Sequence, residues 1–163
     1  MAVRQNSSLD RRQLLSGSGV LAVSALLGPS VARSQTLRLE PSDLFKATRA
    51  ALANGRNIQS GRVVLDIPRL AESGNSVQLK LRVESPMTAG DHVRTVHLLS
   101  EQNPIATIGR FHFTPRSGRA EAETYIRLAT TQNVHAIAEM SDGTLWGTEA
   151  EAVVLLAACL DGG

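Results

Sequence analysis

The sequence contains a single cysteine and very few aromatic residues. Phe, Tyr and Trp make up 3% of its 163 residues, so a core has to be packed from Val, Leu, Ile and Ala. The one cysteine, Cys159, cannot form an internal disulfide, which excludes a disulfide-stabilised scaffold. The chain also has no phosphate-binding glycine loop, no Gly-x-Ser-x-Gly motif and no Cys-x-x-Cys motif. The usual sequence signatures of nucleotide-binding, serine-hydrolase and thiol-redox sites are therefore missing.

Most of the chain also lacks an excess of positive charge. The isoelectric point is about 9.2 and the formal net charge is +2. Four arginines against one aspartate give residues 1–34 a net charge of +3, which leaves −1 for residues 35–163. The basic character belongs to the N-terminal segment, so no nucleic-acid partner is predicted.

Hydrophobic runs long enough to span a membrane are absent, and one short apolar stretch lies near the N-terminus. Residues 20–27 are too short for a membrane span of roughly 20 residues. They follow a basic start and precede small residues, which is the three-part pattern of an export signal. Arg11 and Arg12 resemble the pair in twin-arginine (Tat) signals, whose pathway exports folded proteins. Residues 1–34 are therefore predicted to be a cleaved Tat-type export signal.

Two cleavage positions fit this signal, after Ala32 or after Ser34. Once cleaved, the protein is expected to be periplasmic and to have no membrane segment. The alternative is an uncleaved amphipathic N-terminal helix or anchor.

The mature chain begins with one predicted helix. Ser42 is placed as its N-cap, and Asn54 followed by Gly55 supplies a left-handed stop. The residues at helical spacing that form its apolar stripe are Leu44, Ala47, Thr48, Ala51 and Leu52.

After the helix the apolar period changes to two, which is typical of strands. The predicted strands are residues 63–67, 77–83, 92–99, 105–113, 120–128, 134–140 and 149–156. About seven short strands separated by turns predict an all-β fold, an Ig-like antiparallel β-sandwich preceded by one short N-terminal helix. This domain is expected to span residues 35–156.

Polar side chains on the strands offer little chemistry. The four histidines are His92, His97, His112 and His135. They lie on or beside different strands without a metal-ligand spacing, and each is predicted to point outward. Glu121 and Glu123 share one strand face, and paired carboxylates of this kind are predicted to be solvated. No metal site and no cofactor are expected.

The position of Cys159 is different, because it lies beyond the last predicted strand. The C-terminal arm predicted around it consists of Ala157, Ala158, Leu160, Asp161, Gly162 and Gly163. Cys159 is three residues from the strand end, or about 10 Å when extended. Asp161 and the terminal carboxylate disfavour the thiolate, so partner enzymes are expected to supply the chemistry. The alternative is an incidental cysteine on a frayed tail.

Several short motifs occur along the chain in a fixed order. They are Val64-Leu65-Asp66-Ile67-Pro68, Ala71-Glu72-Ser73-Gly74, Ser85-Pro86-Met87, His97-Leu98-Leu99-Ser100-Glu101-Gln102-Asn103-Pro104, Ile126-Arg127-Leu128-Ala129 and Ala136-Ile137-Ala138-Glu139-Met140-Ser141-Asp142-Gly143. Together with the leader, the helix and the terminal cysteine, this order resembles the SoxY family, the sulfur-carrier subunits of the bacterial thiosulfate-oxidising (Sox) system.

The resemblance implies a carrier or scaffold rather than an enzyme. In that family an Ig-like sandwich forms a heterodimer with a second sandwich subunit, SoxZ. A cysteine on a Gly-Gly-Cys-Gly-Gly arm carries the sulfur, which implies this covalent role for Cys159. A haem-containing enzyme loads thiosulfate, and a manganese-dependent hydrolase releases sulfate.

The arm of this chain departs from the family pattern, because Ala157, Ala158, Leu160 and Asp161 stand where the pattern has its four glycines. Two alternatives therefore stay open. One is a diverged SoxY-like paralogue that pairs with a SoxZ-like subunit without carrying thiosulfate. The other is an exported Ig-like binding module.

Overall fold

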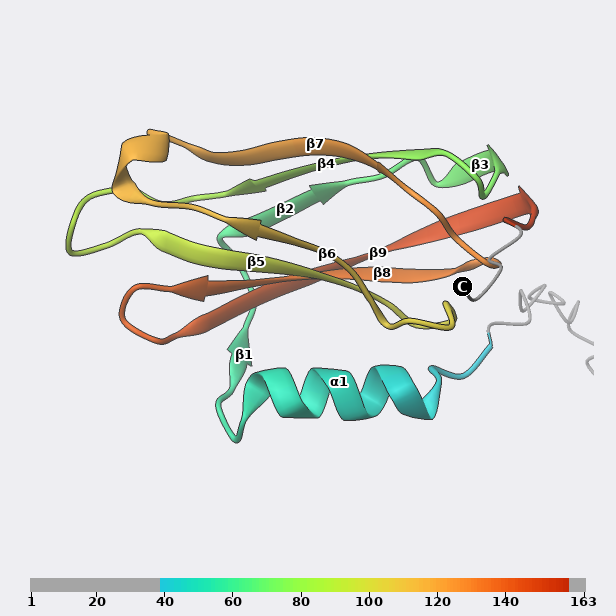
Figure 1. Ribbon diagram of the computed structural model, residues 1–163, viewed down its shortest axis with the longest axis horizontal. Coiled ribbons are helices and arrows are strands. Elements are labelled where there is room, and N and C mark those ends of the chain that lie inside the picture. The colour runs from blue at the N-terminus through green and yellow to red at the C-terminus, as the bar shows by residue number, and fades with distance from the viewer. Residues whose placement is uncertain (1–38, 159–163) are drawn as a thin grey trace, which may run out of the picture. The chain divides into compact units, whose positions relative to one another are not determined.

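A computed structural model describes residues 39–158 of the protein (Figure 1). The chain divides into two units, residues 1–34 and 35–163, and all described residues belong to the second unit. The predicted export signal, with Arg11 and Arg12, lies outside the described residues. The elements are α1 (Asp43–Ala53), β1 (Ile58–Gln59), β2 (Val63–Asp66), β3 (Leu70–Ser73), β4 (Val77–Val83), β5 (Val93–Ser100), β6 (Thr107–His112), η1 (Pro115–Ser117), β7 (Ala120–Ile126), β8 (Gln132–Met140) and β9 (Leu145–Leu156).

The nine strands form two sheets that face each other (Figure 1). The larger sheet has the order β1-β9-β8-β5-β6, with β3 also paired to β9, and the smaller sheet has the order β2-β4-β7. Most neighbours are antiparallel, whereas β1 and β3 run parallel to β9. The predicted antiparallel, Ig-like sandwich with one preceding helix is confirmed. The two strands that the sequence did not predict are β1 and β3.

The buried residues of the main core, between the two sheets, are aliphatic residues and methionines, while Phe111, Phe113 and Trp146 are only partly buried at its margin. In β4 the buried residues alternate with exposed or half-buried ones, as the sequence pattern requires. The fully buried aliphatic residues of this core include Leu79, Val93, Val96, Leu98, Leu128, Val134, Ala136, Ala138 and Ala152. Aliphatic packing therefore replaces the aromatic core that the composition excludes.

A second, smaller core lies between α1 and the outer face of the larger sheet (Figure 1). Phe45 of the helix packs there against Leu99, Ala106, Ile137 and Leu145. Strand β8 is consequently covered on both faces, and all but one of its nine residues are buried. This second layer explains why β8 does not alternate between buried and exposed residues.

The ends of α1 are as predicted, but its buried face is so only in part. Ser42 Oγ accepts a hydrogen bond from the Phe45 N–H at 3.2 Å, and Asn54 adopts φ 46° and ψ 49° at the C-cap. The predicted stripe is correct only in part, because Phe45 is 4% exposed whereas Leu44 is 49% exposed. Leu52 of that stripe does pack against the second core, and Thr48 is half-buried. The correction has a simple cause: the large Phe45 ring fills the space over the sheet, and Ala47 and Ala51 face solvent.

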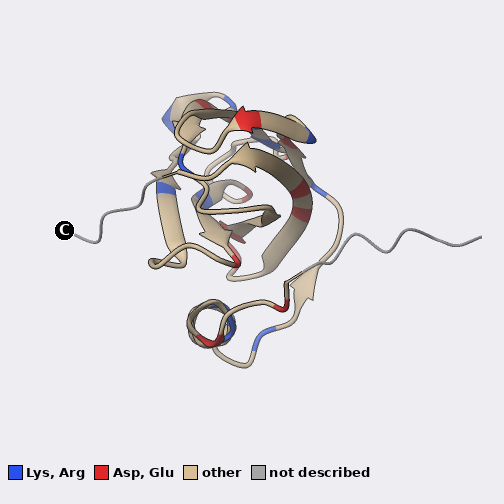
Figure 2. Cartoon of the chain, turned by 90° about the vertical axis from the view of Figure 1, so that its right-hand side faces the viewer, with Lys and Arg blue, Asp and Glu red and all other residues tan. Residues whose placement is uncertain are grey.

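In a view turned by 90° from that of Figure 1, acidic and basic residues are interspersed along the described chain (Figure 2). This distribution agrees with the near-zero charge of residues 35–163. Within residues 39–158, no helix is long and apolar enough to cross a membrane.

Candidate functional site

The last described residues leave the sandwich through a junction of three backbone segments. The N–H of Gly74 donates to the carbonyl of Leu156 at 2.7 Å, where β9 ends. The N–H of Leu128 donates to the Gly74 carbonyl at 2.8 Å, and the N–H of Ala158 donates to the Leu128 carbonyl at 3.1 Å. We call this set of residues, Gly74, Leu128, Leu156 and Ala158, the tail junction.

Gly74 is required at the tail junction because the surrounding backbone leaves no room for a side chain. A Cβ atom at this position would overlap the carbonyl oxygen of Leu128 and lie 2.9 Å from the nitrogen of Ala158. Both neighbours are backbone atoms that already form hydrogen bonds, so neither is free to move aside. The close approach of these segments depends on glycine.

The junction shows how the predicted arm begins. Ala157 is exposed, whereas Ala158 is 8% exposed and hydrogen bonded through its backbone. Ala158 is therefore attached to the sandwich. Cys159, the predicted attachment site, lies outside the described residues, as do Leu160, Asp161, Gly162 and Gly163.

Exposed leucine side chains lie on the two strands that lead to the junction. Leu155 and Leu156 of β9 are 62% and 68% exposed, and Leu70 of the paired strand β3 is 57% exposed. Large apolar side chains at this exposure offer surface that a partner protein can bury. Leu155 and Leu156 are the last two residues of β9, and the Leu156 carbonyl belongs to the tail junction.

His135 is buried, which corrects the prediction that it points outward. Its Nε2 lies 2.9 Å from Glu101 Oε1 and its Nδ1 lies 3.3 Å from Glu149 Oε2. Its ring is tilted against that of Phe45, with the ring centres 4.6 Å apart. The prediction was wrong because α1 covers the outer face of β8. Both ring nitrogens face carboxylates, so His135 fixes the loop after β5 against β8.

His97 is half-buried beneath α1, and its Nε2 is buried without a hydrogen-bond partner among the described residues. It contributes to a cavity of about 280 Å³ that Thr48, Leu52 and Arg110 also line. Burial lowers the pKa of His97, and the nearby Arg110 guanidinium lowers this pKa further. His97 is consequently held in its neutral form near neutral pH.

The other predicted polar residues are not brought together. His112 is exposed, and Glu121 and Glu123 are exposed on β7, as the sequence predicts. Glu123 forms an ion pair with Lys80 at 3.7 Å. Among residues 39–158, no group of three or more His, Cys, Asp or Glu side chains is placed to hold a metal ion.

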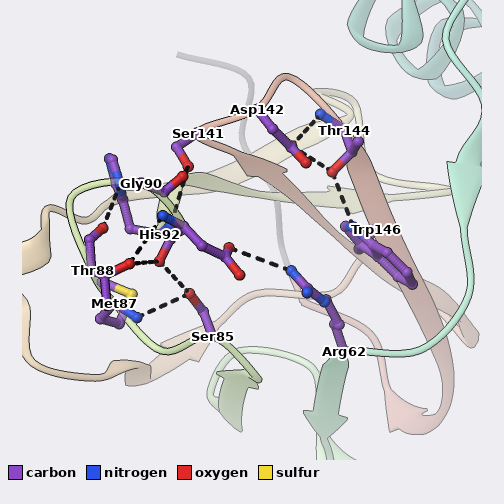
Figure 3. A network of polar contacts seen from close by, with 11 residues as sticks. Arg62, Ser85, Met87, Thr88, Gly90, His92, Ser141, Asp142, Thr144 and Trp146 are labelled. Atoms are coloured by element: carbon purple, nitrogen blue, oxygen red, sulfur yellow. Dashed lines mark hydrogen bonds and ion pairs between the residues drawn. The ribbon is translucent and has the colours of Figure 1, made fainter.

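The opposite end of the sandwich is closed by polar contacts between two loops (Figure 3). The N–H of His92 donates to Ser141 Oγ at 3.1 Å, and Ser141 Oγ donates to the Gly90 carbonyl at 3.1 Å. His92 Nδ1 lies 3.0 Å from the carbonyl oxygen of Thr88. These contacts tie the loop between β4 and β5 to the turn between β8 and β9.

Trp146 lies beside this network and is held from two sides (Figure 3). Its Nε1 donates to Thr144 Oγ1 at 3.1 Å, and the Arg62 guanidinium lies 5.1 Å from its ring centre. The Thr144 N–H and hydroxyl donate to Asp142 and lower the pKa of that carboxyl. This end is thus a structural closure, whereas the tail junction lies at the other end (Figure 1).

The polar residues that sequence reasoning missed are Glu101, which follows β5 directly, and Asn133 on β8; Glu101 contacts both Asn133 and His135. The sequence signal on β8 was weak but present: an amide and an imidazole stand where apolar residues would be expected in a central strand.

Comparison with known proteins adds a family and a fold. A family model described as "Sulfur oxidation protein SoxY" matches residues 48–159, which is more than half of the chain and ends at Cys159. No curated protein matches the sequence.

Two solved structures share the fold. The sulfur carrier protein SoxY from Chlorobium limicola f thiosulfatophilum aligns with a TM-score of 0.56 and 22% identity, covering 67% of this chain and 94% of that one. A superoxide reductase (neelaredoxin) from Ignicoccus hospitalis aligns with a TM-score of 0.54 and 18% identity, covering 61% and 97%. At these identities each likeness concerns the fold alone, whereas the family match concerns the sequence itself. The chain belongs to the SoxY family of sulfur oxidation proteins.

Proposed function

We propose that this protein is a sulfur carrier that holds thiosulfate-derived sulfur covalently on Cys159. The main support is the family match, which ends at the only cysteine of the chain. The backbone leaves the sandwich one residue before Cys159, next to exposed leucine side chains. The protein acts as a carrier, and partner enzymes perform the chemistry.

Loading joins the sulfane sulfur of thiosulfate to the sulfur of Cys159. The thiol loses a proton and the pair loses two electrons, which the haem-containing partner accepts. The product is a cysteine S-thiosulfonate. The manganese-dependent hydrolase then catalyses the attack of water on the terminal sulfonate. This hydrolysis releases sulfate and a proton and leaves a persulfide on Cys159. These two reaction steps require a thiol that is accessible to partner enzymes but is not strongly activated by its own surroundings.

Intact mass spectrometry of the protein purified without reductant from thiosulfate-grown cells tests the carrier function. We expect mass increments of one or more sulfur atoms, of sulfonate or of thiosulfonate, which a reducing thiol removes. The Cys159→Ser variant, with a nearly isosteric side chain, should carry none of them. A clean thiol in every wild-type preparation would contradict the proposal.

The unusual arm supports a second candidate, a diverged paralogue that pairs with a SoxZ-like subunit and carries no thiosulfate. Ala157 and Ala158 narrow the backbone freedom of the arm compared with glycine, and Asp161 adds negative charge near an anionic adduct. Complementation separates the candidates, because only a working carrier restores thiosulfate oxidation to a carrier-deletion strain. An exported binding module of another kind would keep full function as the Cys159→Ala variant.

The proposed cellular place is the periplasm, reached in the folded state through the twin-arginine pathway. The support is the Arg11–Arg12 pair in front of a short apolar stretch. Replacing both arginines with lysine should leave the unprocessed protein in the cytoplasm. Normal export of that variant would argue for another route.

A further inference from the structure

A single side chain from a distant loop clamps the backbone next to the tail junction. Asn103 lies between β5 and β6 and is 7% exposed. Its Nδ2 donates to the carbonyl of Arg127 at 2.8 Å, and its Oδ1 accepts from the N–H of Ala129 at 3.0 Å. The two bonds hold the chain immediately before and immediately after Leu128.

A second amide fixes the orientation of this clamp. Gln132 Nε2 donates to Asn103 Oδ1 at 2.9 Å, and Gln132 Oε1 accepts from the backbone N–H of Gln102 at 2.8 Å. Gln132 is 3% exposed, so the pair is shielded from competing water. The carboxamide of Asn103 supplies a donor and an acceptor side by side on one planar group, which matches the Arg127 carbonyl and the Ala129 N–H.

Leu128 connects the segment held by Asn103 to Ala158. Its side chain is fully buried, and its carbonyl accepts the N–H of Ala158 at 3.1 Å. Its own N–H donates to Gly74, so the peptide groups on both sides of Leu128 are engaged. Ala158 is in turn bonded covalently to Cys159.

We propose that Asn103 is a positioning residue for the sulfur-carrying cysteine. It fixes residues 127–129, whose Leu128 carbonyl holds Ala158, and so sets the point from which Cys159 is presented to partner enzymes. The inference rests on the proposed carrier function. Asn103 itself does not touch the sulfur.

Amide hydrogen exchange of the full mature chain tests the clamp directly. Removing both bonds in Asn103→Ala should make the Ala158 N–H exchange roughly 30-fold faster, since the loss of each hydrogen bond is expected to speed local opening about fivefold. Asn103→Ser keeps a hydroxyl that can satisfy one of the two backbone groups without burying a charge, so it should give a smaller increase. This variant also serves if Asn103→Ala does not fold.

Gln102→Ala is the matched control. Gln102 is the neighbouring residue in the same loop, and its Nε2 donates to the Glu40 carbonyl at 2.7 Å, away from residues 127–129. It should leave exchange at Ala158 unchanged. Equal Ala158 exchange in wild type and in folded Asn103 variants would overturn the inference.

A second readout connects the clamp to function. In Asn103→Ala, loading of Cys159 by partner enzymes should fall several-fold, while its reaction with a small thiol reagent changes less than about twofold. Unchanged loading despite faster exchange would also overturn the positioning role. If the wild type itself never carries sulfur, the proposed function fails, whereas the exchange experiment still decides whether the clamp exists.

Discussion

At the scale of single residues, the fold disfavours the protonated, charged form of His97. The ring is half-buried under α1, and burial followed by the Arg110 guanidinium lowers its pKa from 6.5. Glu139 acts in the opposite direction but less strongly. The described part of the chain offers no hydrogen-bond partner to its buried Nε2.

The surroundings of His97 predict that the folded protein loses stability in mild acid. The unfolded chain binds a proton at His97 near pH 6.5, whereas the folded protein binds it only at lower pH. Stability should therefore fall as the pH drops below 6.5, until the folded-state pKa is reached. In His97→Gln, urea midpoints measured above and below pH 6.5 should differ less than in the wild type.

The control for this experiment is Thr48→Ala, a residue that lines the same cavity and does not titrate. It should keep the wild-type pH dependence. The same pH dependence in His97→Gln and wild type would show that His97 does not contribute to it.

At the scale of elements, α1 depends on one aromatic side chain. Phe45 is 4% exposed, contacts the second core and lies against the His135 ring. Phe45→Ala should lower the free energy of unfolding by about 3–5 kcal/mol, as expected for a buried aromatic residue. Leu44→Ala, one residue earlier and half-exposed, should change it by less than about 1 kcal/mol.

Urea denaturation followed by circular dichroism measures both variants. Similar losses in the two would mean that α1 is not anchored through Phe45. If only Phe45→Ala loses stability, α1 should also cover His135 less tightly in that variant. Native-state hydrogen exchange of β8 would detect this change.

The elements differ in how well local sequence predicts them. The seven predicted strands correspond to real ones because each carries its own apolar alternation or run. β1 and β3 have two and four residues and pair in parallel with β9, so their strand state is set by the partner strand. The predicted face of α1 was correct at Leu52 but wrong at Leu44, since the ring of Phe45 fills the available space instead.

The same reasoning applies to the candidate site. The position of Cys159 beyond the last strand follows from the sequence alone. The tail junction does not, because Gly74, Leu128 and Ala158 meet only when three distant segments come together. Asn103 belongs to the SoxY-like motif of residues 97–104, but its clamp depends on where residues 127–129 lie.

At the scale of the whole described domain, the two ends of the sandwich differ. One end is closed by the network around Ser141, and the other carries the tail junction with Leu70, Leu155 and Leu156 exposed beside it. The sheets also end in open edge strands, β2 and β7 in one sheet and β6 in the other. Such edges are commonly covered by a partner.

This arrangement predicts that the protein made alone forms a homodimer and that a SoxZ-like subunit replaces the second copy. Leu155→Ser combined with Leu156→Ser should shift the homodimer toward monomer, since each buried leucine contributes about 1.5–3 kcal/mol to association. Light scattering at micromolar concentration measures the shift.

Tyr125→Ser is the control that tests which surface forms the dimer interface, because Tyr125 is 66% exposed and lies on the smaller sheet. It should leave the dimer intact. Dissociation by Tyr125→Ser but not by the leucine pair would place the association surface on the smaller sheet, and a wild-type monomer would contradict the prediction altogether.

The tail junction also has a consequence for the order of folding. Gly74, Leu128 and Ala158 come from three segments separated by long stretches of chain, and joining them requires both sheets to be in register. Their hydrogen bonds are thus among the last that a folding chain can complete. A misfolded or half-assembled molecule keeps its cysteine but has no fixed place from which to offer it. Under the proposed carrier function, the thiol is therefore held in a fixed place only after the domain has folded completely. This dependence suits a protein whose proposed export route accepts folded proteins.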